Sequence, residues 1–508
     1  MVSRTKLLSV LTVAVTPFAC QRGPGVDDGS KNQNQPQITN VARDGDDHGR
    51  GDDDDRDDDD RSRPAVRPPD GNPVRPQAPE RELKQMMREV DKRNIQATIQ
   101  KLVSFGTRHT ESSQTDPNVG IGAAINYVFN TMQGYAATSG GRMTVALQTY
   151  HQAPIAGTIL NPAGVDITNV VATIRGSLTP NRIYVISGHL DSRRTIVTNA
   201  APDAPGADDD ASGVAVIMEA ARVFAKHAPE STLVFTAVDG EEQGLFGSTN
   251  QANLFKAAGA DVAGMFSNDI VGSSTAENGV KDAHRLRLFT EGVPTLDTAS
   301  QANLRVLIGG ENDSASRQLG RFVKSVAEND ETDMTVWLMF RRDRYLRASD
   351  HVSYQRVGYT AARFTEPNEI FAHEHQDVRV DPTTGQQFGD LIDFDDFAFM
   401  ERVARVNVAT IWSLSQGPRT PQSIGILAQV LTNSTTMVWA ANTDPDIAGY
   451  EIVWRETTES DWTHAIPVGN VTTATLPIAP KDNFQFGVRA VDLDGHHSPV
   501  GFPTRTSP

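Results

Sequence analysis

The residues best suited to chemistry lie between positions 188 and 242. Gly188-His189-Leu190-Asp191 supplies an imidazole and a carboxylate, Asp208-Asp209-Asp210 three adjacent carboxylates, and Glu241-Glu242 two more. Two distant segments, Asn268-Asp269 and His373-Glu374-His375-Gln376-Asp377, can complete the set. Imidazole nitrogens and carboxylate oxygens bind divalent metals such as zinc, and a protein rarely buries so many of them without a cation. The pattern predicts a two-metal hydrolase.

His189 and Asp191 stand two positions apart at the end of an expected strand, so their side chains project toward the same face. One can bind metal through its imidazole while the other accepts the remaining N–H, as around many protein-bound metals. A buried histidine with ordinary hydrogen-bond partners gives the same pattern. Whether His189 binds metal must therefore be judged from the acids near it in the sequence.

The triplet Asp208-Asp209-Asp210 precedes an expected helix, where one aspartate could serve simply as the N-terminal cap. Three consecutive carboxylates at a buried junction repel one another unless a cation is present. We therefore expect one member of the triplet to bridge two metal ions while backbone N–H groups hold its neighbours.

Glu241 and Glu242 follow another expected strand, and adjacent side chains leaving a strand point apart. One can bind metal while the other reaches the metal-bound water. A carboxylate in that second position acts as the general base of a metal-assisted hydrolysis. The alternative is a pair of exposed loop acids.

Helices and strands alternate in the pattern from position 81 to position 414. Helices are expected at 81–105, 122–132, 214–225, 247–258, 314–327, 350–356 and 394–414, and strands at 143–150, 167–174, 183–187, 232–238, 264–270, 335–340 and 360–365. This alternation predicts an α/β fold with a mixed, mostly parallel central sheet and helices on both faces. Ligands of such sheets collect beyond the carboxyl ends of the strands, where His189, Glu241 and Asp269 stand.

Composition limits the partners and the location. The net charge of −17 over 508 residues argues against a nucleic-acid partner. Residues 1–20 have a basic start and an apolar run, which predicts a secretory signal peptide. The only cysteine, Cys20, follows that run, either near an ordinary cleavage site or as a lipid-anchored residue, although Pro17 stands where lipoproteins carry leucine. We expect an exported protein that is extracellular, periplasmic or membrane-anchored.

Four segments follow from these patterns. Residues 1–20 are the expected signal peptide, residues 21–80 an acidic and proline-rich disordered linker, residues 81–416 the α/β domain that carries the candidate metal ligands, and residues 421–508 a β-sandwich. Short alternating strands at 436–439, 449–455 and 483–491, with Trp439, Tyr450 and Trp454, resemble a fibronectin type III domain. That domain would contact a polymer or a cell surface, or be removed on maturation.

The motifs of residues 85–415 together resemble the di-zinc aminopeptidases of the bacterial leucyl aminopeptidase type, whose relatives include glutamate carboxypeptidases and the transferrin receptor. The resemblance is carried by residues 188–191, 205–213, 241–248, 268–272, 349–351, His373 and 376–377. It implies two Zn²⁺ ions per chain, bound by His189, Asp209, Glu242, Asp269 and His373.

In these roles, His189 and Asp269 would hold the first zinc, Glu242 and His373 the second, and Asp209 would bridge them. The resemblance further implies that Asp191 orients His189, that Glu241 is the general base, and that the Asp209–Asp210 peptide bond is cis. His375 is the alternative to His373, which the motif selects because it stands four residues before Asp377.

The substrate is expected to be a peptide or protein cut at one end, and an aminopeptidase is the favoured form. The arginines of residues 341–347, with Arg363 nearby, could instead bind a substrate carboxylate in a carboxypeptidase, neutralise the acidic site, or lie on the surface. A single-zinc glutaminyl cyclase and a non-catalytic binding protein are also compatible with the resemblance.

Overall fold

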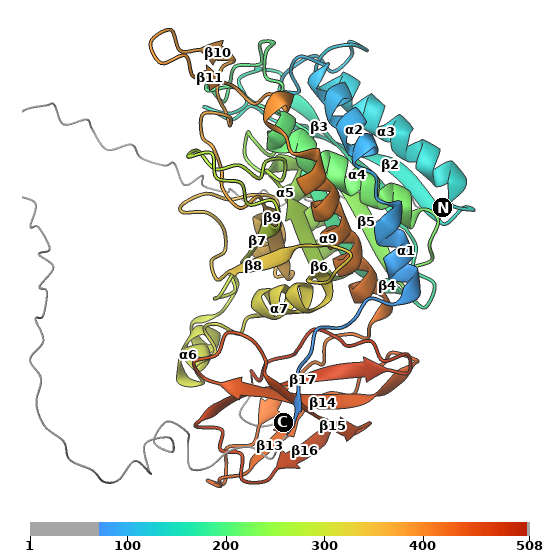
Figure 1. Cartoon of the computed structure of the whole chain (residues 1–508), viewed down its shortest axis with the longest axis vertical. Coiled ribbons are helices and arrows are strands. Elements are labelled where there is room, and N and C mark those ends of the chain that lie inside the picture. Colours follow the sequence, from blue (N-terminus) through green and yellow to red (C-terminus); the bar gives the residue numbers. More distant parts are fainter. Residues whose placement is uncertain (1–70, 505–508) are drawn as a thin grey trace, which may run out of the picture. The chain divides into compact units, whose positions relative to one another are not determined.

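The computed structural model describes residues 71–504 (Figure 1). The expected signal peptide, Cys20 and the Asp-rich run lie outside the described residues. An eight-stranded sheet in the order β2-β3-β5-β4-β6-β9-β7-β8 lies within residues 81–416, which the resemblance implies to be the peptidase domain (hereafter the peptidase part). Its strands are β2 (Met143–Gln152), β3 (Val165–Ile174), β4 (Thr179–His189), β5 (Ser231–Val238), β6 (Asp261–Asn268), β7 (Arg285–Thr290), β8 (Thr335–Met339) and β9 (Ala361–Thr365).

The four central strands run parallel. β4 pairs with β5 and with β6, and β6 pairs with β9, all in parallel. The antiparallel pairs are β2–β3, β3–β5 and β7–β9, away from the centre of the sheet, and β7–β8 is parallel. The predicted α/β fold with a mixed, mostly parallel sheet is confirmed.

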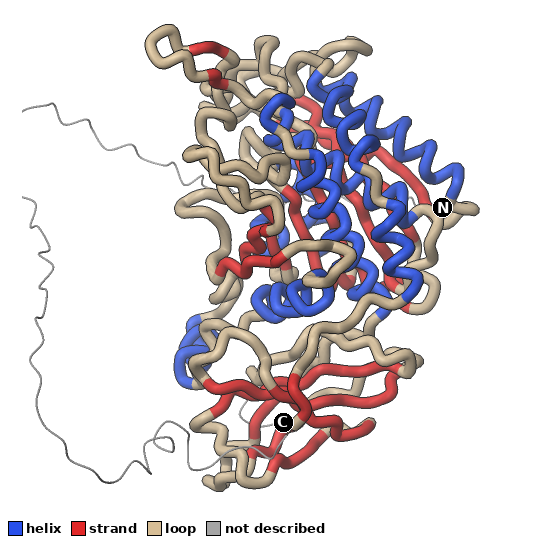
Figure 2. Tube along the Cα trace, in the orientation of Figure 1, coloured by secondary structure: helices blue, strands red, loops and turns tan. Residues whose placement is uncertain are grey.

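Helices cover both faces of this sheet (Figure 2). The main core joins one face to α1 (Arg81–Glu89), α2 (Lys92–Val103), α3 (Ile121–Thr138), α4 (Gly213–Phe224), α7 (Ala315–Ala327) and α9 (Phe397–Gln416). On the other face α5 (Phe246–Ala257) and α8 (His351–Arg356) pack over a smaller core that contains Val185, Ala252 and Tyr354. Among the described residues, no helix is both long and apolar enough to cross a membrane.

Several elements differ from the sequence-based expectation. The helix expected at 81–105 is broken into α1 and α2, because the Asp91 carboxylate caps α2 by accepting the N–H of Arg93 at 2.9 Å. β7 and α6 (Ala299–Leu307) have no counterpart among the expected elements. α6 buries none of its residues, so it does not contribute to the hydrophobic core by which the other helices are held.

The C-terminal part consists of two small sheets around a core that includes Trp439, Tyr450 and Trp454. Their strand orders are β1-β15-β14-β17 and β12-β13-β16. The strands are β1 (Asn72–Pro73), β12 (Gly425–Ile426), β13 (Thr435–Val438), β14 (Ile447–Glu456), β15 (His464–Gly469), β16 (Thr473–Leu476) and β17 (Phe484–Asp492). A short hairpin, β10 (Arg379–Val380) with β11 (Gln387–Phe388), stands apart from both.

The N-terminal segment of the described chain belongs to this sandwich. β1 pairs with β15, and the N–H of Val74 donates to the carbonyl of Thr463 at 2.9 Å. The linker expected to run to residue 80 therefore ends earlier than predicted, because residues 71–80 make backbone hydrogen bonds. The two-residue length of β1 explains why it left no sequence signal.

Charged side chains are buried where the sandwich meets the peptidase part, within one compact unit of the chain. Asp313 stands just before α7. Its Oδ1 lies 3.0 Å from Arg321 Nη1, and its Oδ2 lies 2.7 Å from Arg455 Nη2 of β14. Arg182 of β4 pairs with Asp444, and the indole N–H of Trp462 donates to Gln318 at 2.9 Å. The sandwich is thus joined to the peptidase part by specific polar contacts.

Candidate metal centre

The parallel strands bring the candidate residues to one edge of the sheet. His189 is the last residue of β4 and pairs with Val238, the last residue of β5, which Glu241 follows closely. Asp269 comes directly after β6. Because the carboxyl ends of parallel strands meet at the same edge, an imidazole and two carboxylate-bearing turns converge there.

Two glycines let the N-terminal end of α4 approach these strand ends closely. A Cβ on Gly188 would lie 2.5 Å from the carbonyl carbon of Gly213. A Cβ on Gly213 would lie 2.3 Å from the carbonyl oxygen of Asn268. Neither contact is sterically possible, so only glycine at both positions allows the aspartate triplet, which precedes α4, to sit against the strands.

Backbone hydrogen bonds divide the triplet by role. The Asp210 carboxylate accepts the N–H groups of His189 at 2.8 Å and of Gly213 at 3.0 Å, and Asp208 accepts that of Gly272 at 2.7 Å. These bonds tie the triplet to the ends of β4 and β6 and leave the Asp209 side chain for the cluster. The Asp209–Asp210 peptide bond is cis, as the resemblance implied.

Asp390 is a further support that the sequence did not reveal. Its carboxylate oxygens accept the backbone N–H groups of Asp208 and Asp209, both at 2.8 Å. Since it lies far along the chain in an irregular segment, no spacing or periodicity could have connected it with the triplet.

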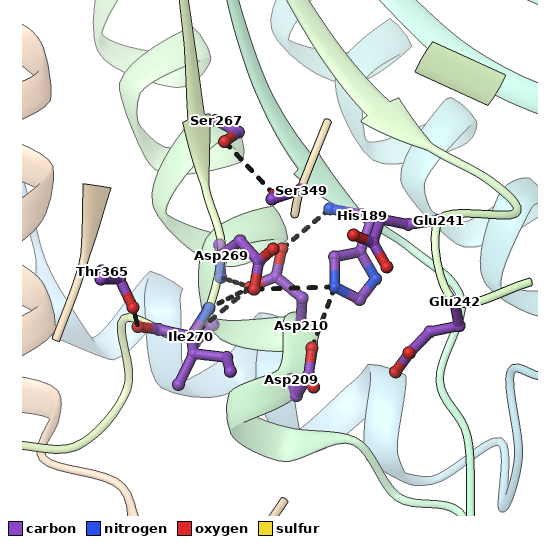
Figure 3. Close-up of polar contacts among 12 residues, drawn as sticks. His189, Asp209, Asp210, Glu241, Glu242, Ser267, Asp269, Ile270, Ser349 and Thr365 are labelled. Atoms are coloured by element: carbon purple, nitrogen blue, oxygen red, sulfur yellow. Dashed lines mark hydrogen bonds and ion pairs between the residues drawn. The ribbon is translucent and has the colours of Figure 1, made fainter. Parts of the chain in front are cut away.

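Two clusters of potential metal ligands share Asp209. In the first, His189 Nε2 lies 2.9 Å from Asp209 Oδ1 and 4.0 Å from Asp269 Oδ1 (Figure 3). In the second, His375 Nε2 lies 2.7 Å from Asp209 Oδ2 and 2.9 Å from Glu242 Oε1. Within each cluster the ligand atoms all lie within 4.8 Å of one another. Four of the five residues expected to bind metal are therefore brought together.

The fifth expected residue, His373, is not in either cluster. Its ring stacks on Phe394 with centroids 3.5 Å apart and planes inclined by 5°. His375 takes its place because its backbone adopts a left-handed conformation, with φ of 49°, and its ring reaches Asp209 and Glu242. The prediction that His373 is a metal ligand was wrong. It relied on the four-residue spacing from Asp377, which takes no account of a left-handed turn within the segment.

Asp191 contacts both the histidine and the glutamate turn. Its carboxylate accepts the backbone N–H of Glu241 at 3.1 Å and that of Glu242 at 3.0 Å. His189 Nδ1 lies 3.1 Å from the Asp191 carbonyl oxygen and 3.7 Å from its carboxylate. Asp191 thus constrains His189 chiefly through its backbone, while its side chain fixes the turn that carries the two glutamates.

The electrostatics of the pocket favour a cation. Burial raises the pKa of Glu241 well above its usual value, and the nearby charges of Asp269 and Glu242 add to the effect. Burial also raises the pKa values of Glu242 and Asp269. So dense a group of buried acids and imidazoles is the donor set that a divalent metal such as zinc requires.

The histidines partly offset this acidity. Burial opposes ionisation of Asp209, but His375 and His189 hold its pKa well below the usual value. Burial likewise opposes protonation of both imidazoles, yet the surrounding carboxylates raise their pKa values well above normal. The carboxylates around both imidazoles thus favour a positive charge at this position.

The clusters line a pocket of about 370 Å³, which also contains Glu241, Arg344 and Arg347. Arg363 is fully buried behind the site and contacts Asp269 at 2.9 Å and Asp343 at 3.1 Å. His351 is also buried, and its Nε2 lies 2.9 Å from the carbonyl oxygen of Arg342. Arg363 therefore supports the pocket wall at Asp269, whereas His351 does not line the pocket.

Comparison with known proteins gives the family. Residues 169–393 match peptidase family M28. A "probable zinc metalloprotease" of Pyrenophora teres f. teres is 49% identical over 430 residues, which cover 84% of this chain and 88% of that protein. A protein of the same description from Pyricularia oryzae is 49% identical over 440 residues, with 86% and 87% covered.

A solved structure, the LapA aminopeptidase of Legionella pneumophila, aligns with 66% of this chain and 74% of its own, at 19% identity and a TM-score of 0.47. The two fungal proteins are the stronger comparison, because their identity extends over most of both chains. On that similarity and on the profile match across the aspartate triplet and the glutamate pair, the chain belongs to peptidase family M28.

Proposed function

We propose that the protein is a zinc-dependent exopeptidase that binds two zinc ions. The observation that carries the proposal is the pair of ligand clusters sharing Asp209. The fungal relatives, described as probable zinc metalloproteases, support zinc as the metal. Two adjacent clusters support a two-ion peptidase over a single-zinc glutaminyl cyclase, and the complete ligand set supports an enzyme over a non-catalytic binding protein.

His189 and Asp269 would hold one ion, Glu242 and His375 the other, and Asp209 both. Each ion would then have three protein ligands, the number typical of catalytic zinc sites that keep a position open for water or substrate. Bound zinc supplies Lewis acidity and lowers the pKa of a coordinated water toward neutrality.

Glu241 is the proposed general base. Its carboxylate lines the pocket but belongs to neither ligand cluster, so it remains available to take a proton from the attacking water. Its raised pKa suits a group that must afterwards return this proton to the leaving amine. Asp191 would keep the base in place by binding the N–H groups of Glu241 and Glu242.

The end of the peptide at which cleavage occurs has two candidates. The sequence resemblance favours an aminopeptidase. A carboxypeptidase is the second candidate, and the presence of Arg344 and Arg347 in the pocket wall favours it, because guanidinium groups bind carboxylates.

A metal analysis combined with a substrate panel tests the proposal. We expect two zinc ions per chain and a peptidase activity that a chelator abolishes and zinc restores. Peptides blocked at the amino terminus and peptides amidated at the carboxyl terminus then separate the two forms. Failure to hydrolyse any peptide end in the zinc-loaded state would contradict the proposed function.

Export is proposed on the sequence alone, with Cys20 as the candidate lipid anchor. We also propose that the C-terminal sandwich, which resembles a fibronectin type III domain, contacts a polymer or a cell surface. Mass spectrometry of the mature N-terminus and a pull-down with insoluble polymers test these two proposals.

A further inference from the structure

The arginines near the pocket differ sharply in position. Arg363 is fully buried and neutralises Asp269 and Asp343. Arg341 is exposed and lies 5.6 Å from the ring of Tyr345, outside the pocket. Arg344 and Arg347 line the pocket beside the ligand clusters. The sequence left three roles open for these arginines: binding a substrate carboxylate, neutralising the acidic site, or lying on the surface. In the structure Arg363 neutralises acids, Arg341 lies on the surface, and the other two are placed where a substrate could reach them.

Glu369 holds the two pocket arginines from behind. Its carboxylate accepts hydrogen bonds from Arg344 Nη1 at 3.0 Å and from Arg347 Nη1 at 2.7 Å. It also accepts one from Arg287 Nη2 at 2.8 Å. One carboxylate therefore faces three guanidinium groups. Glu369 thus fixes the positions of Arg344 and Arg347. Asp343 and Glu374 contact the same two guanidinium groups, at 3.1 Å and 3.2 Å respectively.

Arg347 keeps donors available for a ligand. Its hydrogen bonds use Nη1, to Glu369, and Nη2, to Glu374 at 3.2 Å, so the Nε–H and a second hydrogen on each Nη remain. Its side chain is 30% exposed, whereas that of Arg344 is 9% exposed and contacts Asp343, Glu369 and the Ala348 carbonyl. Arg347 is therefore the residue that can meet a substrate, whereas the Arg344 guanidinium is bonded within the protein.

The acids of the pocket lead to the same conclusion. Among the described residues that line it, the carboxylates are Asp209, Glu241, Glu242 and Asp269. Under the proposed function all four are engaged as metal ligands or as the base. Glu369 and Glu374 also contact Arg347, but both are already its ion-pair partners. The remaining guanidinium hydrogens can be donated to a substrate carboxylate, whereas a guanidinium offers an ammonium group no acceptor.

We infer that Arg347 binds the carboxylate of the residue that leaves, so that the preferred substrates carry a free carboxylate directly after the scissile bond. This inference rests on the proposed function and names its substrate class, namely peptides whose carboxyl-terminal residue is released. It selects the carboxypeptidase form and predicts that amidation of that carboxylate removes the main charged contact of the substrate.

Matched substrates and variants test the inference. We expect N-acetyl-Leu-Leu to be cleaved with a kcat/KM roughly 10- to 100-fold above that of N-acetyl-Leu-Leu-amide, as for loss of a charge-assisted hydrogen-bonded pair. Arg347→Met should remove this difference mainly by raising KM for the free acid, and Arg347→Lys should restore part of it. Arg341→Met, on the same loop but outside the pocket, is the matched control and should behave as wild type.

A binding measurement separates this inference from the proposed function. N-acetyl-leucine and its amide are titrated into the zinc-loaded protein and into its Arg347→Met variant, with zinc content measured in both. We expect the acid to bind at least about tenfold more tightly than the amide in the wild type, and equally in the variant. Equal binding of acid and amide by the wild type, or preferential cleavage of peptides with a free amino terminus and an amidated carboxyl end, would overturn the inference even if zinc-dependent hydrolysis is observed. Absence of hydrolysis with selective acid binding would instead overturn the peptidase proposal alone.

Discussion

The chain buries charge in two regions, and the two are balanced differently. Where the sandwich meets the peptidase part, Asp313 lies between Arg321 and Arg455, and Arg182 pairs with Asp444. At the carboxyl edge of the sheet, Asp209 and its neighbouring acids face imidazoles across the two ligand clusters.

The first region is satisfied by the chain itself, since Asp313 and Asp444 both have guanidinium partners. The second has more acids than permanent cations and relies on histidines whose charge depends on pH. A buried ion pair of the first kind contributes to specificity of packing, while an unbalanced group of the second kind requires a ligand. The balance of buried charge thus separates structural polar contacts from a functional site.

The largest expected effect is at the general base. Glu241→Gln should lower kcat by roughly 10²- to 10⁴-fold, because the amide cannot accept the proton of the attacking water. Zinc content should stay unchanged, since Glu241 belongs to neither cluster. Steady-state kinetics with metal analysis checks both results, and wild-type turnover in this variant would remove Glu241 as the base.

Substitution of the two nearby histidines should give opposite results. His375→Ala removes a ligand of the second cluster and should lower the zinc content from two ions to about one, with loss of most activity. His373→Ala removes only a ring stacked on Phe394 and should keep both ions. Loss of zinc in the His373 variant and not in the His375 variant would restore the sequence-based assignment.

The balanced region is tested by Asp313→Asn, which leaves Arg321 and Arg455 without their carboxylate. We expect the free energy of unfolding to fall by about 3–5 kcal/mol, with zinc binding retained at low temperature. The matched control is Asp461→Asn at the partly exposed Lys324–Asp461 pair, 3.4 Å apart, where about 1 kcal/mol or less is expected. Denaturant unfolding of both variants measures the difference, and equal losses would contradict the assignment of Asp313 as a structural centre.

Zinc affinity should rise with pH. The neighbouring carboxylates raise the pKa values of His189 and His375, so both imidazoles hold protons in the metal-free protein, and zinc must displace them. Below those raised pKa values the affinity should rise about tenfold per pH unit for each proton displaced. Calorimetry in buffers of different protonation enthalpy counts these protons, and an affinity that is independent of pH would count against the two histidines as ligands.

Sequence reasoning succeeded where local pattern and chemistry coincide. His189, Glu242 and Asp269 follow strands that their apolar residues indicate, and the rule for the carboxyl ends of parallel strands then brings them together. Repulsion within the triplet predicted that one of its members binds metal, and the family resemblance selected Asp209.

It failed where distant or irregular backbone decides the outcome. His375 depends on a left-handed turn, Asp390 on a contact with residues far away in sequence, and β1 on pairing with β15. None of these leaves a periodic or compositional signal, because each is created by tertiary packing.

The central claim is that two ions share Asp209, and anomalous diffraction at the zinc absorption edge tests it most directly. Crystals of the zinc-loaded protein should show two peaks per chain, both within bonding distance of Asp209, one beside His189 and Asp269 and the other beside Glu242 and His375. A single peak, or a second peak away from Asp209, would contradict it.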